Sequence, residues 1–254
     1  MKFKDTSYGD LTGQTYKGDI DISYKGITSL EGAPDKVIGN FECESNGGLH
    51  SLEFSPSEIT GQFNVESCNL KSLEKGPKIV GGDYIVKKNA LTGLKGAPTT
   101  INETFDCSFN RITSLKDAPK SVGYNFNCVD TDIKTLEGSP ATVGGVFYCY
   151  GNDELESFKG APAKVGDFWA TGLPKIKSFE YAPKEIDGYF RCDDSIPNIE
   201  DPTNEIIKQQ IMAKYYIVGN SRTDFVNIKY RMTQYKNNLG VKSKGFRTLL
   251  GLDK

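Results

Sequence analysis

Histidine, tryptophan and methionine are scarce in this chain of 254 residues, which has one, one and three of them. The single histidine is His50, and no two of the six cysteines stand close together in the sequence. Zinc sites use closely spaced cysteines or cysteine with histidine, and a cysteine nucleophile needs a nearby base. The sequence therefore predicts no metal site, no cofactor, no catalytic residue and no small-molecule substrate, so we expect no enzyme.

Long apolar runs are also missing, and none approaches the length of roughly 20 residues that a membrane-spanning helix needs. The start, MKFKDTSYGDLTG, has no apolar stretch after its basic residues, which disfavours a secretory signal. We therefore expect a cytoplasmic protein without a membrane partner, whose cysteines stay free. A net charge of −2 disfavours binding of a polyanion by the chain as a whole.

A repeated unit fills most of the sequence and is marked by regularly spaced prolines, with a period of about 21 residues that is typical of stacked coils. The prolines are Pro34, Pro56, Pro77, Pro98, Pro119, Pro140, Pro162 and Pro183. Aromatic residues follow them at a nearly constant distance, at Phe41, Phe63, Tyr84, Phe105, Phe126, Phe147, Phe168 and Phe190. A cysteine or small apolar residue stands two positions after each aromatic, and an asparagine commonly follows three positions later. The unit reads roughly V-x-G-x-F-x-C-x-x-N-x-L-x-S-L-x-G-A-P.

The physical interpretation of one unit is a short strand followed by a turn. In Phe105-Asp106-Cys107 apolar and polar residues alternate, as in a strand with one buried face. Such a strand cannot bury its face alone, so we expect the units to stack edge to edge around one core. Cys107 is then a buried side chain, and Asn110 binds backbone groups of the turn.

This pattern resembles the leucine-rich repeat, L-x-x-L-x-L-x-x-N/C-x-L, and is most similar to its short bacterial class. It also resembles repeats of uncharacterised phage proteins. The resemblance implies an α+β solenoid with one parallel β-sheet of about nine strands and a concave binding face. We expect an N-terminal cap over residues 1–17, the solenoid over 18–198 and a small helical C-terminal subdomain over 199–254.

The outward strand positions differ along the predicted solenoid. The N-terminal third is acidic, with Asp19, Asp21, Glu42, Glu44 and Glu66, and is interpreted mainly as a solvated surface. Aromatic side chains and one arginine lie on adjacent strands of the C-terminal third, a composition typical of protein interfaces. The predicted partner-binding residues are Tyr148, Tyr150, Trp169, Tyr189, Arg191 and Ile85. Burial of these residues under the C-terminal helices is the alternative.

The C-terminal segment loses the repeat. Ile206, Ile207, Ile211, Met212, Tyr215 and Tyr216 recur at helical spacing, and Phe225 begins a second apolar stripe, as in amphipathic helices. Two helices that cap the stack are the favoured interpretation. The alternative is binding of nucleic acid or an acidic partner through Lys229, Arg231, Lys236, Lys242, Lys244 and Arg247.

The function predicted from the sequence is non-enzymatic recognition of a partner protein through the concave strand face. The phage resemblance implies a host partner, such as a defence factor that is blocked or redirected, and the host cytoplasm as the location. A structural protein of the virion and nucleic-acid binding are the alternatives.

Overall fold

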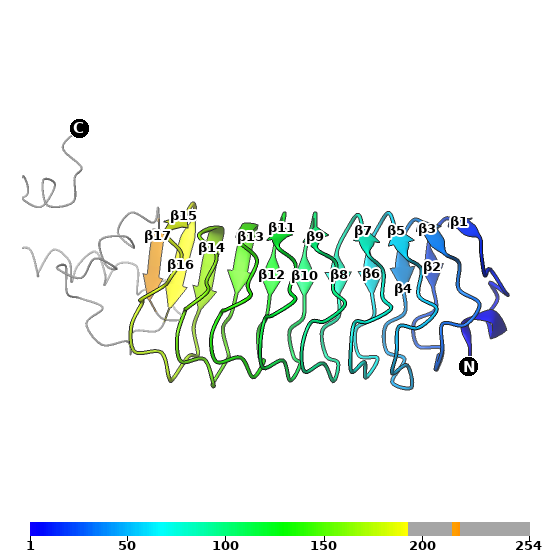
Figure 1. Ribbon diagram of the computed structural model, residues 1–254, viewed down its shortest axis with the longest axis horizontal. Coiled ribbons are helices and arrows are strands. Elements are labelled where there is room, and N and C mark those ends of the chain that lie inside the picture. The colour runs from blue at the N-terminus through cyan, green and yellow to red at the C-terminus, as the bar shows by residue number, and fades with distance from the viewer. Residues whose placement is uncertain (193–214, 219–254) are drawn as a thin grey trace, which may run out of the picture.

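The computed structural model describes residues 1–192 and 215–218 and shows a parallel β-solenoid of about eight turns. Figure 1 shows the coils stacked in a row, from β1 near the N-terminus to β17 at the other end. Each coil carries short strands joined by turns. The described residues contain one short 3₁₀ helix, η1 (Phe3–Asp5), and no α-helix.

The main ladder runs through ten parallel strands in the order β17-β16-β14-β13-β12-β10-β8-β6-β4-β2. Its strands are β2 (Ile20–Asp21), β4 (Phe41–Glu42), β6 (Phe63–Asn64), β8 (Tyr84–Ile85), β10 (Phe105–Asp106), β12 (Phe126–Asn127), β13 (Thr142–Tyr148), β14 (Lys164–Ala170), β16 (Tyr189–Cys192) and β17 (Tyr215–Val218). The register places each repeat aromatic beside the next, as in Phe105↔Phe126 and Phe126↔Phe147.

A second row of strands precedes the main ladder in each coil. It is formed by β1 (Thr15–Lys17), β3 (Lys36–Ile38), β5 (Glu58–Ile59), β7 (Ile79–Val80), β9 (Thr100–Ile101), β11 (Ser121–Val122) and β15 (Glu185–Ile186). The first four make a separate sheet, whereas β11 pairs with β9 and β13, and β15 pairs with β14. In most coils glycine lies between the two rows, and in β13 and β14 one strand runs through both. An added Cβ at Gly123 would lie 2.0 Å from the Asn102 carbonyl oxygen, so a larger residue would force the coils apart.

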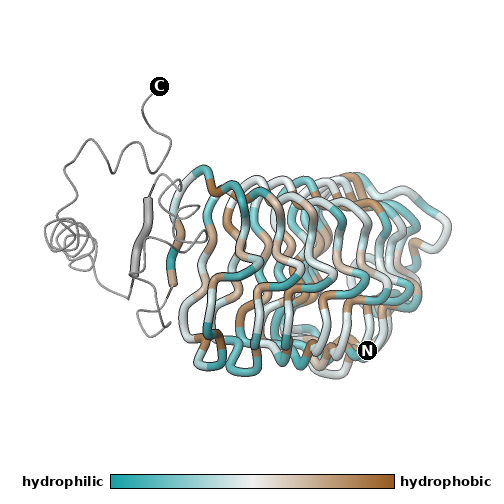
Figure 2. The backbone as a smooth tube through the Cα atoms, turned by 60° about the vertical axis from the view of Figure 1, so that its left-hand side comes forward, coloured by the Kyte–Doolittle hydropathy of each residue, from teal (hydrophilic) through white to brown (hydrophobic). Residues whose placement is uncertain are grey.

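The core consists of stacked rows of identical positions. Ring centroids of neighbouring ladder aromatics lie 5.1 Å apart for Phe126–Phe147 and 5.6 Å for Phe105–Phe126. Such pairs add about 0.5–1.5 kcal/mol each beyond the area they bury. In Figure 2 brown and teal bands recur at the same places from coil to coil. Phe3 covers the N-terminal end by stacking on Tyr8 and Phe41.

Buried asparagines bond backbone groups of their own turn, as predicted, and also tie successive coils together, which was not predicted. Nδ2 of Asn110 donates to the carbonyl oxygens of Cys107 in its own coil (3.0 Å) and Val86 in the preceding coil (3.1 Å). Its Oδ1 accepts the backbone N–H groups of Asn89 (3.2 Å) and Leu91 (3.1 Å). Asn46, Asn89 and Asn152 make the same kind of bridge.

Two features of the predicted fold are wrong. The α+β class with one sheet of about nine strands is replaced by an all-parallel β-solenoid with two sheets. The predicted helix that included Tyr215 and Tyr216 is contradicted where the structure describes it, because Tyr215–Val218 forms β17, parallel to β16. β16 pairs with β14 on one side, and its other side can add a parallel strand where a helix would not pair. The other predicted helical positions lie outside the described residues.

Candidate functional site

The position directly after each ladder aromatic points away from the core on the strand face, which we define as the solvent side of the main ladder. From the N-terminal end the column reads Asp21, Glu42, Asn64, Ile85, Asp106, Asn127, Tyr148, Trp169 and Arg191. Four of these side chains accept the backbone N–H two residues later, at distances of 3.0–3.1 Å: Asp21, Asn64, Asp106 and Asn127. These four turn the chain at the end of the strand, so their polarity serves the fold.

The last three members of the column form a continuous cluster on β13, β14 and β16. The rings of Tyr148 and Trp169 meet edge to face, with centroids 5.1 Å apart. The Arg191 guanidinium carbon lies 4.5 Å from the centroid of the Trp169 ring. Tyr150, two residues after Tyr148, packs its ring edge to face on Tyr148 at 6.2 Å. We call Tyr148, Tyr150, Trp169 and Arg191 the aromatic patch.

The patch is ordered by its own contacts and only partly buried. Tyr148, Trp169 and Arg191 are half-buried, and Tyr150 is 37% exposed. Nε1 of Trp169 is buried without a hydrogen-bond acceptor among the described residues. A guanidinium stacked on an indole in this way is attracted by the ring and keeps its N–H groups at the edges available. The arrangement can therefore offer apolar area and hydrogen-bond donors together.

Burial raises the pKa of the Tyr148 hydroxyl, and Tyr150, Asp167 and Tyr124 raise it further. Tyr124 lies near the patch, because its carbonyl oxygen accepts the N–H of Gly145, three residues before Tyr148, at 2.7 Å, and it is 57% exposed. Tyr124 was not among the predicted site residues, because it stands two residues before Phe126, at a position that is glycine in most other coils. The sequence signal that could have identified Tyr124 is a large side chain at a position that is glycine in most coils.

The remaining predicted site residues lie at different distances from the patch. Tyr189 is exposed on β16, two residues before Arg191, so both side chains leave the same face of the strand. Ile85 is half-buried on β8, and β10 and β12 separate it from β13, so it does not join the patch. The six basic candidates, from Lys229 to Arg247, lie outside the described residues.

The column before the aromatics forms a second set of bridges between coils, which was not predicted from the sequence. Oδ1 of Asp19 accepts the N–H of Asn40 (2.7 Å), and Oδ1 of Asn40 accepts that of Gln62 (2.8 Å). Asp83, Asn125 and Asp167 accept the corresponding N–H of the following coil at 2.7–2.8 Å. Polar residues that look free for binding in the sequence therefore hold the corner of each coil.

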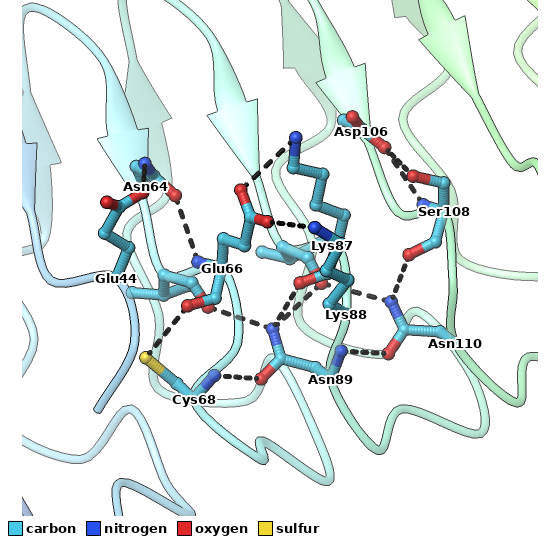
Figure 3. Close-up of polar contacts among 12 residues, drawn as sticks. Glu44, Asn64, Glu66, Cys68, Lys87, Lys88, Asn89, Asp106, Ser108 and Asn110 are labelled. Atoms are coloured by element: carbon cyan, nitrogen blue, oxygen red, sulfur yellow. Dashed lines mark hydrogen bonds and ion pairs between the residues drawn. The ribbon is translucent and has the colours of Figure 1, made fainter. Parts of the chain in front are cut away.

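The middle of the strand face is neutralised internally, as Figure 3 shows. The Glu66 carboxylate pairs with Nζ of Lys87 (3.2 Å) and of Lys88 (2.9 Å). Burial alone would raise the pKa of Glu66, but the bonds to Lys88 and Lys87 outweigh burial and lower it. Asp106 is buried and its oxygen accepts the Ser108 hydroxyl at 2.6 Å, and burial raises its pKa. This part of the face satisfies its own charges.

The cysteines belong to the core, as predicted. All six are free and buried. Burial raises the pKa values of Cys107 and Cys128 well above the usual range, which keeps both thiols protonated and unreactive. Within residues 1–192 and 215–218 no group of histidine, cysteine or acidic side chains could hold a metal ion.

The second row of strands carries a shallow groove of about 370 Å³ on the other side of the coil corner. Thr100, Ser121 and Thr142 lie side by side along it, in parallel register, with Lys164 next to Thr142. Lys164 is already paired with Glu185 and Asp187 at the end of the groove. Water can already satisfy the small hydroxyl side chains, and the lysine is neutralised within the chain, so a ligand would gain few contacts in this groove. The aromatic patch is therefore the stronger candidate.

None of the helices in the described ranges is long and apolar enough to cross a bilayer. No protein-family model, curated protein or solved structure matches the chain, so its resemblance to leucine-rich repeat proteins stays a prediction.

Proposed function

We propose that this chain is a non-enzymatic binding protein that recognises a partner protein through the aromatic patch. The observation that carries the proposal is the contiguous packing of Tyr148, Trp169 and Arg191 on three neighbouring strands. Four other members of the same column are engaged in their own turns. Among the described residues, Tyr148 and Trp169 form no such turn, and the side chains of the patch pack on one another.

The physics of interfaces supports this choice. Tyrosine, tryptophan and arginine dominate the binding energy of protein interfaces, where truncation of one such residue commonly costs about 2 kcal/mol or more. Side chains that already pack on one another lose little rotamer freedom when a partner arrives. The stacked strands beneath them are bonded coil to coil, so the patch keeps its shape.

The compartment and the partner class are part of the same proposal. Six buried free thiols are compatible with a reducing cytosol. By its resemblance to phage repeat proteins, the partner we expect is a host protein, such as a defence factor, and binding would block or redirect it. This last step rests on analogy of sequence pattern and not on the patch itself.

The test compares Tyr148→Ala/Trp169→Ala with a control, Tyr24→Ala/Tyr181→Ala. Tyr24 and Tyr181 are 72% and 55% exposed and lie off the patch. Affinity capture from host lysate with quantitative mass spectrometry should give a protein retained by the wild type and the control but lost with the patch variant. Equal retention of every captured protein by all three would refute the proposal. Far-UV circular dichroism checks folding, and Tyr150→Ala/Arg191→Ala replaces a patch variant that fails to fold.

A further inference from the structure

The strand face carries a large excess of negative charge. This face has three columns of positions, which stand one residue before, one residue after and three residues after each ladder aromatic. In the described chain the basic residues of these columns are Lys87 and Arg191. The described acidic residues in the same columns are Asp19, Asp21, Glu42, Glu44, Glu66, Asp83, Asp106 and Asp167. Among the described residues, Glu66 is the one acidic member of this set with an ion pair.

The excess is concentrated at Asp21, Glu42 and Glu44, on the first two coils. Burial raises the pKa of Glu42, and the neighbouring charges of Glu44 and Asp21 raise it further. The carboxylates of Glu42 and Glu44 accept hydrogen bonds from the Gln62 and Asn64 side-chain amides at 3.0 and 3.3 Å. No cation of the described chain forms an ion pair with either. We call Asp21, Glu42 and Glu44 the acidic end.

The turn after β2 explains Asp21, whose carboxylate accepts the Ser23 N–H, but among the described residues no bond of this kind explains the carboxylates of Glu42 and Glu44. Asp21 and Glu42 are direct partners in the parallel register of β2 and β4, and like charges beside one another on neighbouring strands destabilise a sheet. The next coil shows the alternative at Glu66, which lysines of the adjacent coil neutralise. A cation supplied by a bound partner would do at the acidic end what Lys87 and Lys88 do at Glu66.

We propose that the partner lays a cationic polypeptide segment along the strand face, with lysine or arginine at the acidic end and apolar side chains on the aromatic patch. This inference rests on the proposed function and specifies the chemistry of its partner. The two ends are separated by five strand spacings, from β4 to β13. At the usual separation of neighbouring strands this distance is about 24 Å. A helix of about 16 residues spans it.

Other occupants fit less well. The eight carboxylates of these columns would repel the phosphates of a nucleic acid. A bound metal ion is disfavoured, because no group of three or more side chains in the described residues, the acidic end included, could ligate one. A basic segment has the required charge, and its apolar residues match the patch.

The experiment measures fluorescence anisotropy of three labelled peptides of equal length on the full chain. The peptides carry lysine, glutamine or glutamate at one end and leucines at the other. The proteins are the wild type, Glu42→Gln/Glu44→Gln and the control Glu53→Gln/Glu156→Gln, whose exposed carboxylates lie off the strand face and whose change in net charge is the same.

We expect the lysine peptide to bind the wild type most tightly and the glutamate peptide most weakly. The acidic-end variant should lose about fivefold in affinity for the lysine peptide, the size of two exposed ion pairs, while the control keeps its affinity. Equal binding of the lysine and glutamine peptides would overturn the inference, and so would an equal loss in both double variants.

The Tyr148→Ala/Trp169→Ala variant separates this inference from the proposed function. If it loses its captured partner while Glu42→Gln/Glu44→Gln retains that partner, the patch is the site and the cationic segment is wrong. If the acidic-end variant alone loses the lysine peptide and the partner, the cationic contact at the acidic end stands, but the proposed function and the apolar contact with the patch are both wrong. Loss of binding in both, with the control unchanged, supports both.

Discussion

Replacement of Asn110 by alanine tests the bridges that hold the coils together. The Asn110 side chain is buried, and it serves two donors and three acceptors: the N–H groups of Asn89 and Leu91, and the carbonyl oxygens of Val86, Cys107 and Ser108. Because the two amide hydrogens are shared among three carbonyls, about four net hydrogen bonds are lost. At about 1 kcal/mol each, the free energy of unfolding should fall by about 3–4 kcal/mol.

The assay is urea unfolding followed by circular dichroism, with Arg111→Ala as the matched control. Arg111 is exposed beside Asn110. Replacement of such a surface residue should change stability by less than about 0.5 kcal/mol. Asn110→Thr should fall between the two, because Thr131 occupies this position in the next coil and its hydroxyl donates to the Cys128 carbonyl (3.2 Å). A loss below about 1 kcal/mol in Asn110→Ala would show that the bridge contributes little, since one buried group left unpaired already costs that much.

Three further predictions concern charge, backbone strain and thiols. Burial raises the pKa of Asp106 in the folded chain. The protonated carboxyl therefore stabilises the fold at low pH. This contribution is lost as the pH rises from the ordinary aspartate pKa, about 4, through the raised pKa of the folded state. Asp106→Asn should therefore unfold at higher urea than the wild type at pH 7, with the difference vanishing near pH 3, and a constant difference would contradict this. Phe54 is 54% exposed and has a left-handed backbone with φ 67°. Gly96 holds the equivalent position of another coil, with φ 102°. Phe54→Gly should raise stability by about 0.5–1 kcal/mol in the same assay, and a loss would show that the ring packs. The six buried thiols should react with Ellman's reagent only at the rate of unfolding, and a fast native reaction would contradict their burial.

The core could be predicted from the sequence because its signal repeats. Phe105, Cys107 and Asn110 recur at a fixed spacing, and a position that recurs in every coil has the same neighbours in every coil. Burial of Phe105 and Cys107 and the bond of Asn110 to its own turn followed from that regularity, whereas its bonds to the preceding coil did not. The aromatic patch residues could be proposed as neighbours for the same reason, since equal positions in adjacent repeats lie on adjacent strands.

The second row of strands and the bridges before the aromatics were not predictable in the same way. In strands such as Ile79–Val80 the buried residue, Val80, is followed two positions later by Gly82 and not by a second apolar residue, so no alternating pattern marks the strand. Asp19 bonds to Asn40, and Asp83 to Thr104, so the role of each acid depends on a backbone group one coil away. At the end of the stack, tertiary context decided the outcome. Tyr215–Val218 fits a helical stripe in sequence but pairs with the open edge of β16.

The decisive experiment is capture of a partner by the wild type, the patch variant and the tyrosine control. It asks whether stacking uses up the inner and turn-forming side chains and leaves the aromatic patch as the binding surface. We expect a protein that is retained by the wild type and by Tyr24→Ala/Tyr181→Ala and is lost by folded Tyr148→Ala/Trp169→Ala. Retention of that protein by all three would contradict this expectation.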